Sequence, residues 1–411
     1  MQRIRQLVSA ALFGSLLATT APLVQADTIS TKAVMETYVN IAHASFDDAL
    51  ATAKILQDKI NAFIANPSAE THQAAKDAWL AARIPYGQTE AFRFSNKNVD
   101  EWEGQVNAWP LDEGLIDYVK QDSYDHEEGN PFASANIIAG KDPINVELLK
   151  SLNEKGGSEA NVGTGYHAIE FLLWGQDFNE NPQDAGKRPH TDYAKADACT
   201  NGNCERRAEY LKAATDLLVA DLQTMADDWA SGKENYRKAF LAIDEQEAVR
   251  RMLFGMGSLS LGELAGERMN VALLARSQED EHSCFSDNTH HDIAENARSI
   301  QNIFNGTYTR TNGTTVTGTS LAQLLAAKDA KVSETLVGKL ADTQQKVEAI
   351  VTAAKNGEHF DQQITADNKD GNKRIKTAIA ALRSQTGDIE AAAKVLGIDN
   401  LNPESSDSFG G

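Results

Sequence analysis

The amino-acid sequence predicts an all-α fold made of duplicated helical bundles, in which two related halves pack together and irregular loops are inserted. Apolar residues recur at spacings of three and four through most of the chain, which is typical of amphipathic helices. Strand-like alternation is nearly absent outside residues 307–319, a Thr- and Gly-rich stretch in which we expect a small hairpin. The segments 90–96 and 281–287 share Glu, Phe and Ser at matching positions. This weak internal repeat indicates a duplication.

The chain divides into four parts. Residues 1–26 are typical of a cleavable secretory signal, because a basic start is followed by a short apolar stretch at 7–17 and by small residues at Val24 and Ala26. We expect residues 27–200 and 201–400 to form the first and second helical-bundle halves, and residues 401–411 to form a tail. The predicted location is the periplasm or the outer envelope surface.

Four stretches carry the helical pattern most clearly. Residues 41–64, 211–229 and 322–354 show amphipathic stripes. Residues 249–276 are apolar nearly all round and contain four glycines, so we expect a central helix whose neighbours approach its backbone closely. The segments 95–147 and 176–206 contain many Pro, Gly and Asn residues, which predicts irregular structure.

The charge balance limits the classes of partner. The chain has 39 Lys and Arg against 59 Asp and Glu, a net charge of −20, and removal of Arg3 and Arg5 with the signal makes it −22. Nucleic acid binding needs a basic face, so we expect no nucleic acid partner. An acidic surface is compatible with attracting cations, although it usually serves solubility.

The chain has three cysteines. Cys199 and Cys204 flank the turn-forming sequence Thr-Asn-Gly-Asn, and in an oxidising compartment we expect them to form a disulfide. A metal site of the Cys-x4-Cys type is the minor alternative. Cys284 is left without a cysteine partner by this pairing.

His167 and Glu170 are the residues on which we expect any chemistry to be centred. Their spacing of three places both side chains on one face of a helix, and imidazole with carboxylate suits iron, zinc or another transition metal. Ferritin-like bundles hold iron with Glu-x-x-His, the same spacing in reverse order. Glu170 begins an apolar run, where a carboxylate needs a partner. The alternative is a buried His–Glu pair that only braces the helices.

The surroundings of this motif resemble a known family. Gly165-x-His167-x-x-Glu170 followed by Phe-Leu-Leu-Trp-Gly-Gln-Asp177 is similar to the signature of imelysin-like proteins, including the bacterial iron-regulated protein A group. Three further segments match in order: Pro85-Tyr86 with 90–94, Trp109-Pro110-Leu-Asp-Glu113, and 280–290. The resemblance implies two related helical halves that meet at the His-x-x-Glu motif. It also implies two functions, envelope iron acquisition and peptidase activity.

Further site residues come from the repeated segments. Glu90 and Glu281 occupy equivalent positions in them, and His282 follows the second, so we expect these three to join His167 and Glu170 around a metal. Arg93 is expected to pair with Glu90, with another carboxylate or with an anionic ligand. Residues 280–292 also contain His290 and His291. We interpret this segment either as a metal-binding cluster or as a plain turn followed by the start of a helix.

The motifs favour metal binding over proteolysis. A zinc peptidase normally shows His-Glu-x-x-His or its inverse, whereas His126-Glu127 continues with Glu-Gly-Asn and Glu170 is followed by Phe. We therefore expect a protein that binds a metal ion, iron or an iron complex with zinc as an alternative, and that works with an outer-membrane or other envelope partner in iron uptake. A metal-dependent peptidase and a structural or interaction protein of the envelope are the other hypotheses.

Overall fold

The computed structural model describes residues 29–120, 122, 124, 126–177 and 185–405, and it confirms the all-α prediction. Two short antiparallel strands, β1 (Thr307–Thr309) and β2 (Thr315–Thr317), are the sheet structure in these ranges, with Tyr308 opposite Val316. The expected hairpin is thereby confirmed. The predicted secretory signal lies outside the described residues. No helix in the described ranges combines the length and apolar character that a membrane crossing requires.

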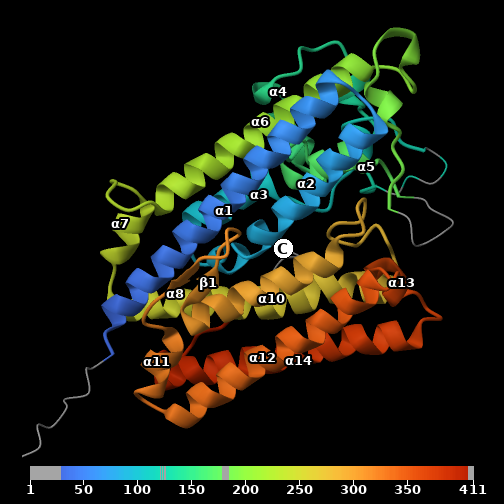
Figure 1. Ribbon diagram of the computed structural model, residues 1–411. Coiled ribbons are helices and arrows are strands. Elements are labelled where there is room, and N and C mark those ends of the chain that lie inside the picture. The colour runs from blue at the N-terminus through green and yellow to red at the C-terminus, as the bar shows by residue number, and fades with distance from the viewer. Residues whose placement is uncertain (1–28, 121, 123, 125, 178–184, 406–411) are drawn as a thin grey trace, which may run out of the picture.

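The helices form two groups that lie against each other (Figure 1). The first group and its connections contain α1 (Thr31–Ala65), α2 (Ala69–Gly87), η1 (Glu90–Phe92), α3 (Lys97–Val106), η2 (Glu113–Leu115), η4 (Ile137–Ala139), α4 (Val146–Lys150), η5 (Lys155–Gly157), α5 (Gly165–Trp174), η6 (His190–Tyr193), η7 (Ala196–Ala198), α6 (Cys204–Trp229) and α7 (Tyr236–Leu241). The second contains α8 (Glu245–Ser258), the π-helix η8 (Leu259–Val271), α9 (Ala272–Ala275), α10 (Thr289–Asn305), α11 (Leu321–Ala326), α12 (Ala330–Lys355), α13 (Phe360–Ile364) and α14 (Lys369–Val395).

The first group is built on the long helix α1, which packs against both α2 and α6. Its buried stripe includes Phe46, Leu56, Ile60 and Phe63, the periodicity expected of a helix with one apolar face. Helix α6 also packs against α5. The first group therefore extends past residue 200, where the sequence places the boundary between the halves.

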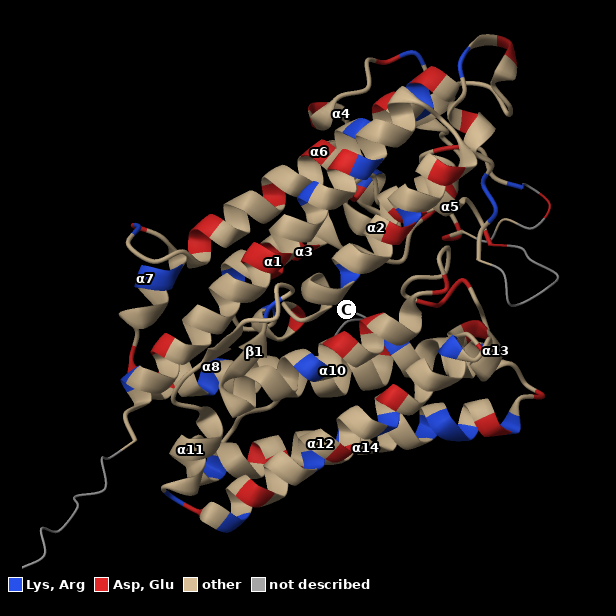
Figure 2. Cartoon of the chain, viewed as in Figure 1, with Lys and Arg blue, Asp and Glu red and all other residues tan. Residues whose placement is uncertain are grey.

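The second group is a bundle in which α10 packs on α12, α12 on α14, and α14 on the π-helix. The predicted 322–354 stretch is divided into α11 and α12, because the Asp329 side chain accepts hydrogen bonds from the backbone of Lys331 and Val332 and so begins a new helix. Lys and Arg are interspersed with Asp and Glu along the helices of both groups (Figure 2).

The predicted central helix at 249–276 is observed as the continuous run from α8 through the π-helix to α9. Close approach of neighbouring backbone explains two of its glycines. A Cβ added at Gly255 would lie 2.6 Å from the carbonyl oxygen of Ala91, and one added at Gly257 would lie 2.7 Å from Cγ of Pro403. The first contact joins the central run to the segment that contains Glu90.

Candidate metal site between the helical groups

His167 and Glu170 lie on the short buried helix α5, whose first residue must be glycine. Gly165 has φ +80°, and a Cβ there would lie 2.3 Å from the carbonyl oxygen of Val106. From this start, His167 Nδ1 lies 2.9 Å from Glu170 Oε2. The other carboxyl oxygen accepts hydrogen bonds from the backbone N–H and the hydroxyl of Ser286, at 3.0 and 2.6 Å. His167 Nε2 is buried and has no hydrogen-bond partner among the residues that the structure describes.

His282 reaches the same place from the other helical group. Its ring centroid lies 4.6 Å from that of His167, and the two planes are nearly perpendicular. His282 Nδ1 lies 2.8 Å from Asp292 Oδ2 on α10, and its Nε2 lies 3.5 Å from Asn107 Nδ2. Both imidazoles are therefore held at Nδ1 by a carboxyl group, which is the arrangement that protein ligands of metals usually show.

The protonation of these groups is governed first by burial. Burial lowers the pKa of His167 well below its usual value, and the neighbouring His282 lowers it further. Burial and then Arg268 lower the pKa of His282 to about 4. Burial raises the pKa of Glu170 to about 8, although Ser286 opposes this rise. Burial also acts to raise the pKa of Asp292, but Arg83 and His282 together hold it well below its usual range. Both imidazoles are consequently neutral at pH 7.

Glu90 and Arg93, which the sequence places at the site, lie in a network of ion pairs beside it. Glu90 pairs with Arg268 of the π-helix at 3.1 Å, and Arg268 also binds Glu263 at 2.8 Å. Arg93 pairs with Glu103 at 3.4 Å and with Glu263 at 3.6 Å. A cavity of about 390 Å³ opens along this network, and its lining includes Arg93, Glu103, Asn107, Glu263, Arg268 and His282. The cavity therefore gives access to one of the two imidazoles.

Glu281 does not face these ion pairs. It is fully buried, and burial together with the carboxyl groups of Asp361 and Asp287 raises its pKa well above the usual value. The structure thus brings His167, Glu170 and His282 together and places Glu281 in a separate group of acids. Across the described ranges no three His, Cys, Asp or Glu side chains are already arranged around one point as a metal cage.

Sequence reasoning did not single out Arg83, Asn107, Ser286 or Asp292. Arg83 donates from Nη2 to Asp292 Oδ1 at 3.0 Å and from Nη1 to Asn107 Oδ1 at 2.6 Å. The only trace in the sequence is an arginine within the otherwise apolar face Trp79, Ala82 and Tyr86 of α2, because a buried guanidinium requires an acidic partner.

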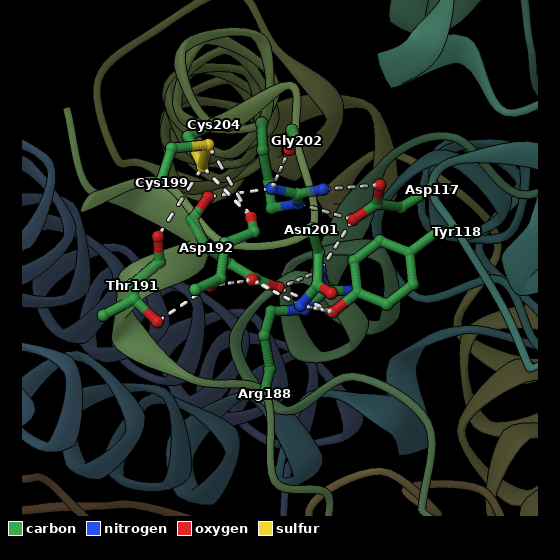
Figure 3. The surroundings of a disulfide bond; sticks show 11 residues. Asp117, Tyr118, Arg188, Thr191, Asp192, Cys199, Asn201, Gly202 and Cys204 are labelled. Atoms are coloured by element: carbon green, nitrogen blue, oxygen red, sulfur yellow. Dashed lines mark hydrogen bonds and ion pairs between the residues drawn. A yellow bond between two sulfur atoms is a disulfide. The ribbon is translucent and has the colours of Figure 1, made fainter. Parts of the chain in front are cut away.

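Cys199 and Cys204 lie away from this site, where the loop after η7 leads into α6, whose first residue is Cys204. Cys199 and Cys204 are joined by a disulfide (Figure 3). The loop that it closes carries Gly202, whose carbonyl accepts from Arg207, and Asn201, whose amide donates to Asp192 at 2.8 Å. Arg207 in turn binds Asp117. Cys284 is buried as a free thiol.

Comparison with known proteins decides the family. The Imelysin family model, a peptidase family numbered M75, matches residues 42–389. This chain belongs to the imelysin family. The resemblance noted from the His-x-x-Glu motif is thereby confirmed.

Individual relatives agree with the family. Iron-regulated protein A of Synechococcus elongatus is 24% identical over 326 residues, which cover 77% of this chain and 72% of that protein. The crystal structure of an iron-regulated protein A precursor from Parabacteroides distasonis superimposes with a TM-score of 0.64 at 19% identity, over 88% of this chain and 94% of that one. An imelysin-like protein from Psychrobacter arcticum gives a TM-score of 0.56 at 16% identity, over 90% and 97%. These two structures support the helical fold.

Proposed function

We propose that this imelysin-family protein binds iron, as the hydrated ion or as a small iron complex, between the imidazoles of His167 and His282. The observation that carries the proposal is the buried Nε2 of His167, which has no hydrogen-bond partner in the described part of the chain while its Nδ1 is held by Glu170. A buried polar nitrogen without a hydrogen-bond partner destabilises the fold, unless a ligand binds to it. A neutral imidazole nitrogen beside a second imidazole suits a transition metal.

In this proposal the two histidines are the protein ligands, and the two carboxyl groups position them. Glu170 and Asp292 fix the orientation of the rings through Nδ1, and such outer partners raise the basicity of the ligating nitrogen. Two protein ligands leave coordination positions for water or for a chelating molecule in the adjoining cavity. Arg93 and Arg268 line that cavity and are the groups that would contact an anionic chelator.

The cellular setting belongs to the same proposal. The predicted signal at residues 1–26 would place the protein in the periplasm or at the outer envelope surface. There, iron bound reversibly by two histidines could be passed to an envelope partner in iron uptake. The name of the Synechococcus elongatus relative, iron-regulated protein A, favours iron over zinc as the cargo.

Calorimetric titration of the mature protein with Fe²⁺ without oxygen, and with Zn²⁺, tests the proposal. We expect one site that is lost in both His167→Ala and His282→Ala. The matched control is His126→Ala, which removes an exposed histidine and should leave binding unchanged. Absence of binding by the unaltered protein, or binding that survives both substitutions, would reject the site.

The two other hypotheses predict different results with the same variants. A peptidase centred here would cleave a peptide library in a chelator-sensitive way, and that cleavage would disappear in His167→Ala. A purely bracing role would lower the melting temperature in His167→Ala and Glu170→Ala without any change in metal binding.

A further inference from the structure

A second cavity, of about 560 Å³, lies between loops of the first helical group and the loop that joins α9 to α10. It shares Trp109 and Pro110 with the cavity beside His282 that is lined by Arg93 and Arg268. Cavities of this size, where two helical groups meet, are typical binding sites for small organic molecules. Its lining residues lie in four segments, 109–113, 126–127, 157–160 and 277–285.

The walls of this second cavity carry negative charge, and we call it the acidic cavity. Its acids are Asp112, Glu113, Glu127, Glu159, Glu279 and Asp280. In the described part of the chain its lining contains no Lys or Arg. The surrounding sequence shows the same imbalance, because residues 101–160 contain 13 Asp and Glu against four Lys and no Arg. The charge of the walls therefore favours a cationic ligand.

Neutral donors, rather than arginines, hold these carboxyl groups in place. Asp112 accepts hydrogen bonds from the backbone N–H of Glu127 at 3.3 Å and from Nδ2 of Asn130 at 2.6 Å. Glu127 accepts one from the hydroxyl of Ser158. Asp292, by contrast, binds a buried arginine. The wall of the acidic cavity is thus ordered while its negative charge is retained.

Glu113 is the most buried of these acids, with an exposed fraction of 3%. Burial and then the carboxyl group of Glu279 raise the pKa of Glu113 well above its usual value, although hydrogen bonds from its own backbone and from Gln176 oppose this rise. None of these neighbours is positively charged. A cation in the cavity would stabilise the ionised form of Glu113, and so would supply the counterion that the protein does not.

Apolar side chains form the remaining walls and indicate that the cation carries hydrocarbon. Trp109, Leu111 and Phe285 belong to the lining, and aromatic rings attract ammonium groups as well as methylene groups. A bare metal ion fits less well, because across the described ranges no three His, Cys, Asp or Glu side chains are placed to hold one. The acids are instead spread along the walls, where a ligand with several separated positive charges can reach more of them.

We propose that the acidic cavity binds a linear aliphatic amine with two or more ammonium groups. These groups pair with Glu113 in the buried wall and with Glu127, which is exposed, and the methylene groups between them contact Trp109 and Phe285. The proposal does not depend on iron binding, because the lining of the acidic cavity includes neither of the two proposed histidine ligands.

Calorimetric titration of the mature protein with spermidine, in the presence of a metal chelator and about 150 mM NaCl, tests this site. We expect one site, with a Kd that rises about tenfold or more in Glu113→Gln and by a smaller factor in Glu127→Gln. The matched control is Glu128→Gln, which removes the neighbouring exposed carboxylate that does not line the cavity and should leave the Kd unchanged. Butylamine, with one ammonium group, should bind about tenfold or more weakly than spermidine.

The same titration separates this site from the proposed iron site, because His167→Ala should bind spermidine as the unaltered protein does. Glu127→Gln keeps the test valid even if Glu113→Gln fails to fold. The proposal is overturned if spermidine does not bind, or if Glu128→Gln weakens binding as much as Glu127→Gln, since equal losses would show general attraction to an acidic surface. It is also overturned if a lysine-rich peptide binds and spermidine does not, which would assign the acidic cavity to a basic segment of a partner protein.

Discussion

The guanidinium of Arg83 on α2 binds the carboxylate of Asp292 on α10, and this buried ion pair joins the two helical groups directly behind His282. Nε and Nη2 of Arg83 lie 3.2 and 3.0 Å from Asp292 Oδ1. The other carboxyl oxygen of Asp292, Oδ2, lies 2.8 Å from His282 Nδ1. One carboxylate therefore fixes both the contact between the groups and the orientation of a proposed ligand.

Removing the arginine should be costly. Arg83→Met leaves Asp292 buried without its counterion, and we expect a loss of about 3–5 kcal/mol in the free energy of unfolding, measured by urea denaturation. Lys97→Met removes one partner of an exposed pair with Glu101 and should change stability by less than about 0.5 kcal/mol. Similar losses in the two variants would show that the buried pair is not special.

The proposed metal site should release a proton when it is occupied. Glu170, with its pKa raised to about 8, is mostly protonated at pH 7, and a cation at His167 favours its ionised form. We therefore expect the affinity for Zn²⁺ to fall up to about tenfold for each pH unit below 8. Calorimetry in buffers of different ionisation enthalpy measures the proton released, and Glu170→Gln should abolish this contribution. Equal proton release in that variant would assign the proton to another group.

Stability should fall in acid partly through His72. Its Nε2 lies 2.8 Å from the carbonyl oxygen of Leu173, and burial lowers its pKa to about 4. Below pH 6.5, the pKa of His72 in the unfolded chain, the unfolded chain binds a proton at His72 but the folded protein does not. The free energy of unfolding therefore decreases as the pH falls from 6.5 towards 4. The contribution is at most about 3 kcal/mol. His72→Gln should unfold with a shallower pH dependence across this window, and an unchanged slope would contradict the assignment.

The disulfide should stabilise a local network rather than the metal site. Cys199→Ser/Cys204→Ser releases a short loop, and the chain-entropy model gives a loss of about 2 kcal/mol. The loop residues Asn201 and Gly202 contact Asp192 and Arg207, so hydrogen exchange should rise at the start of α6. Metal affinity should stay unchanged, and a drop in affinity would link the loop to the site.

Two glycines in helices should respond in opposite directions to alanine. Gly255→Ala places a methyl group against the carbonyl of Ala91 and should cost about 1–3 kcal/mol. Gly338→Ala on α12 has open space around its Cβ and should gain about 0.5–1 kcal/mol, because alanine restricts the unfolded chain and favours helix. Chemical denaturation of both variants measures the contrast.

The sequence was sufficient where the determinant is local. Apolar periodicity identified α1 and α6, and the spacing of His167 and Glu170 identified the contact between them. The sequence could not predict the ion pair between Arg83 and Asp292, which are 209 residues apart. Their contact depends on how α2 packs on α10. The same reason applies to Glu90, because spacing alone could not predict its ion pair with Arg268 of the π-helix.

The π-helix Leu259–Val271 makes the central run unusually sensitive to a change in length. In a π-helix the hydrogen bonds connect residues five apart, which brings Glu263 and Arg268 onto one side, where they bind each other. Deleting a single residue between them would leave the pair four residues apart, which an α-helix still accommodates on one face. However, it would rotate the helix after the deletion by about 100° relative to the helix before it, so Arg268 would no longer bind Glu90 while Glu263 keeps its contact with Arg93. Homologues should therefore tolerate substitutions along this segment far better than insertions or deletions within it.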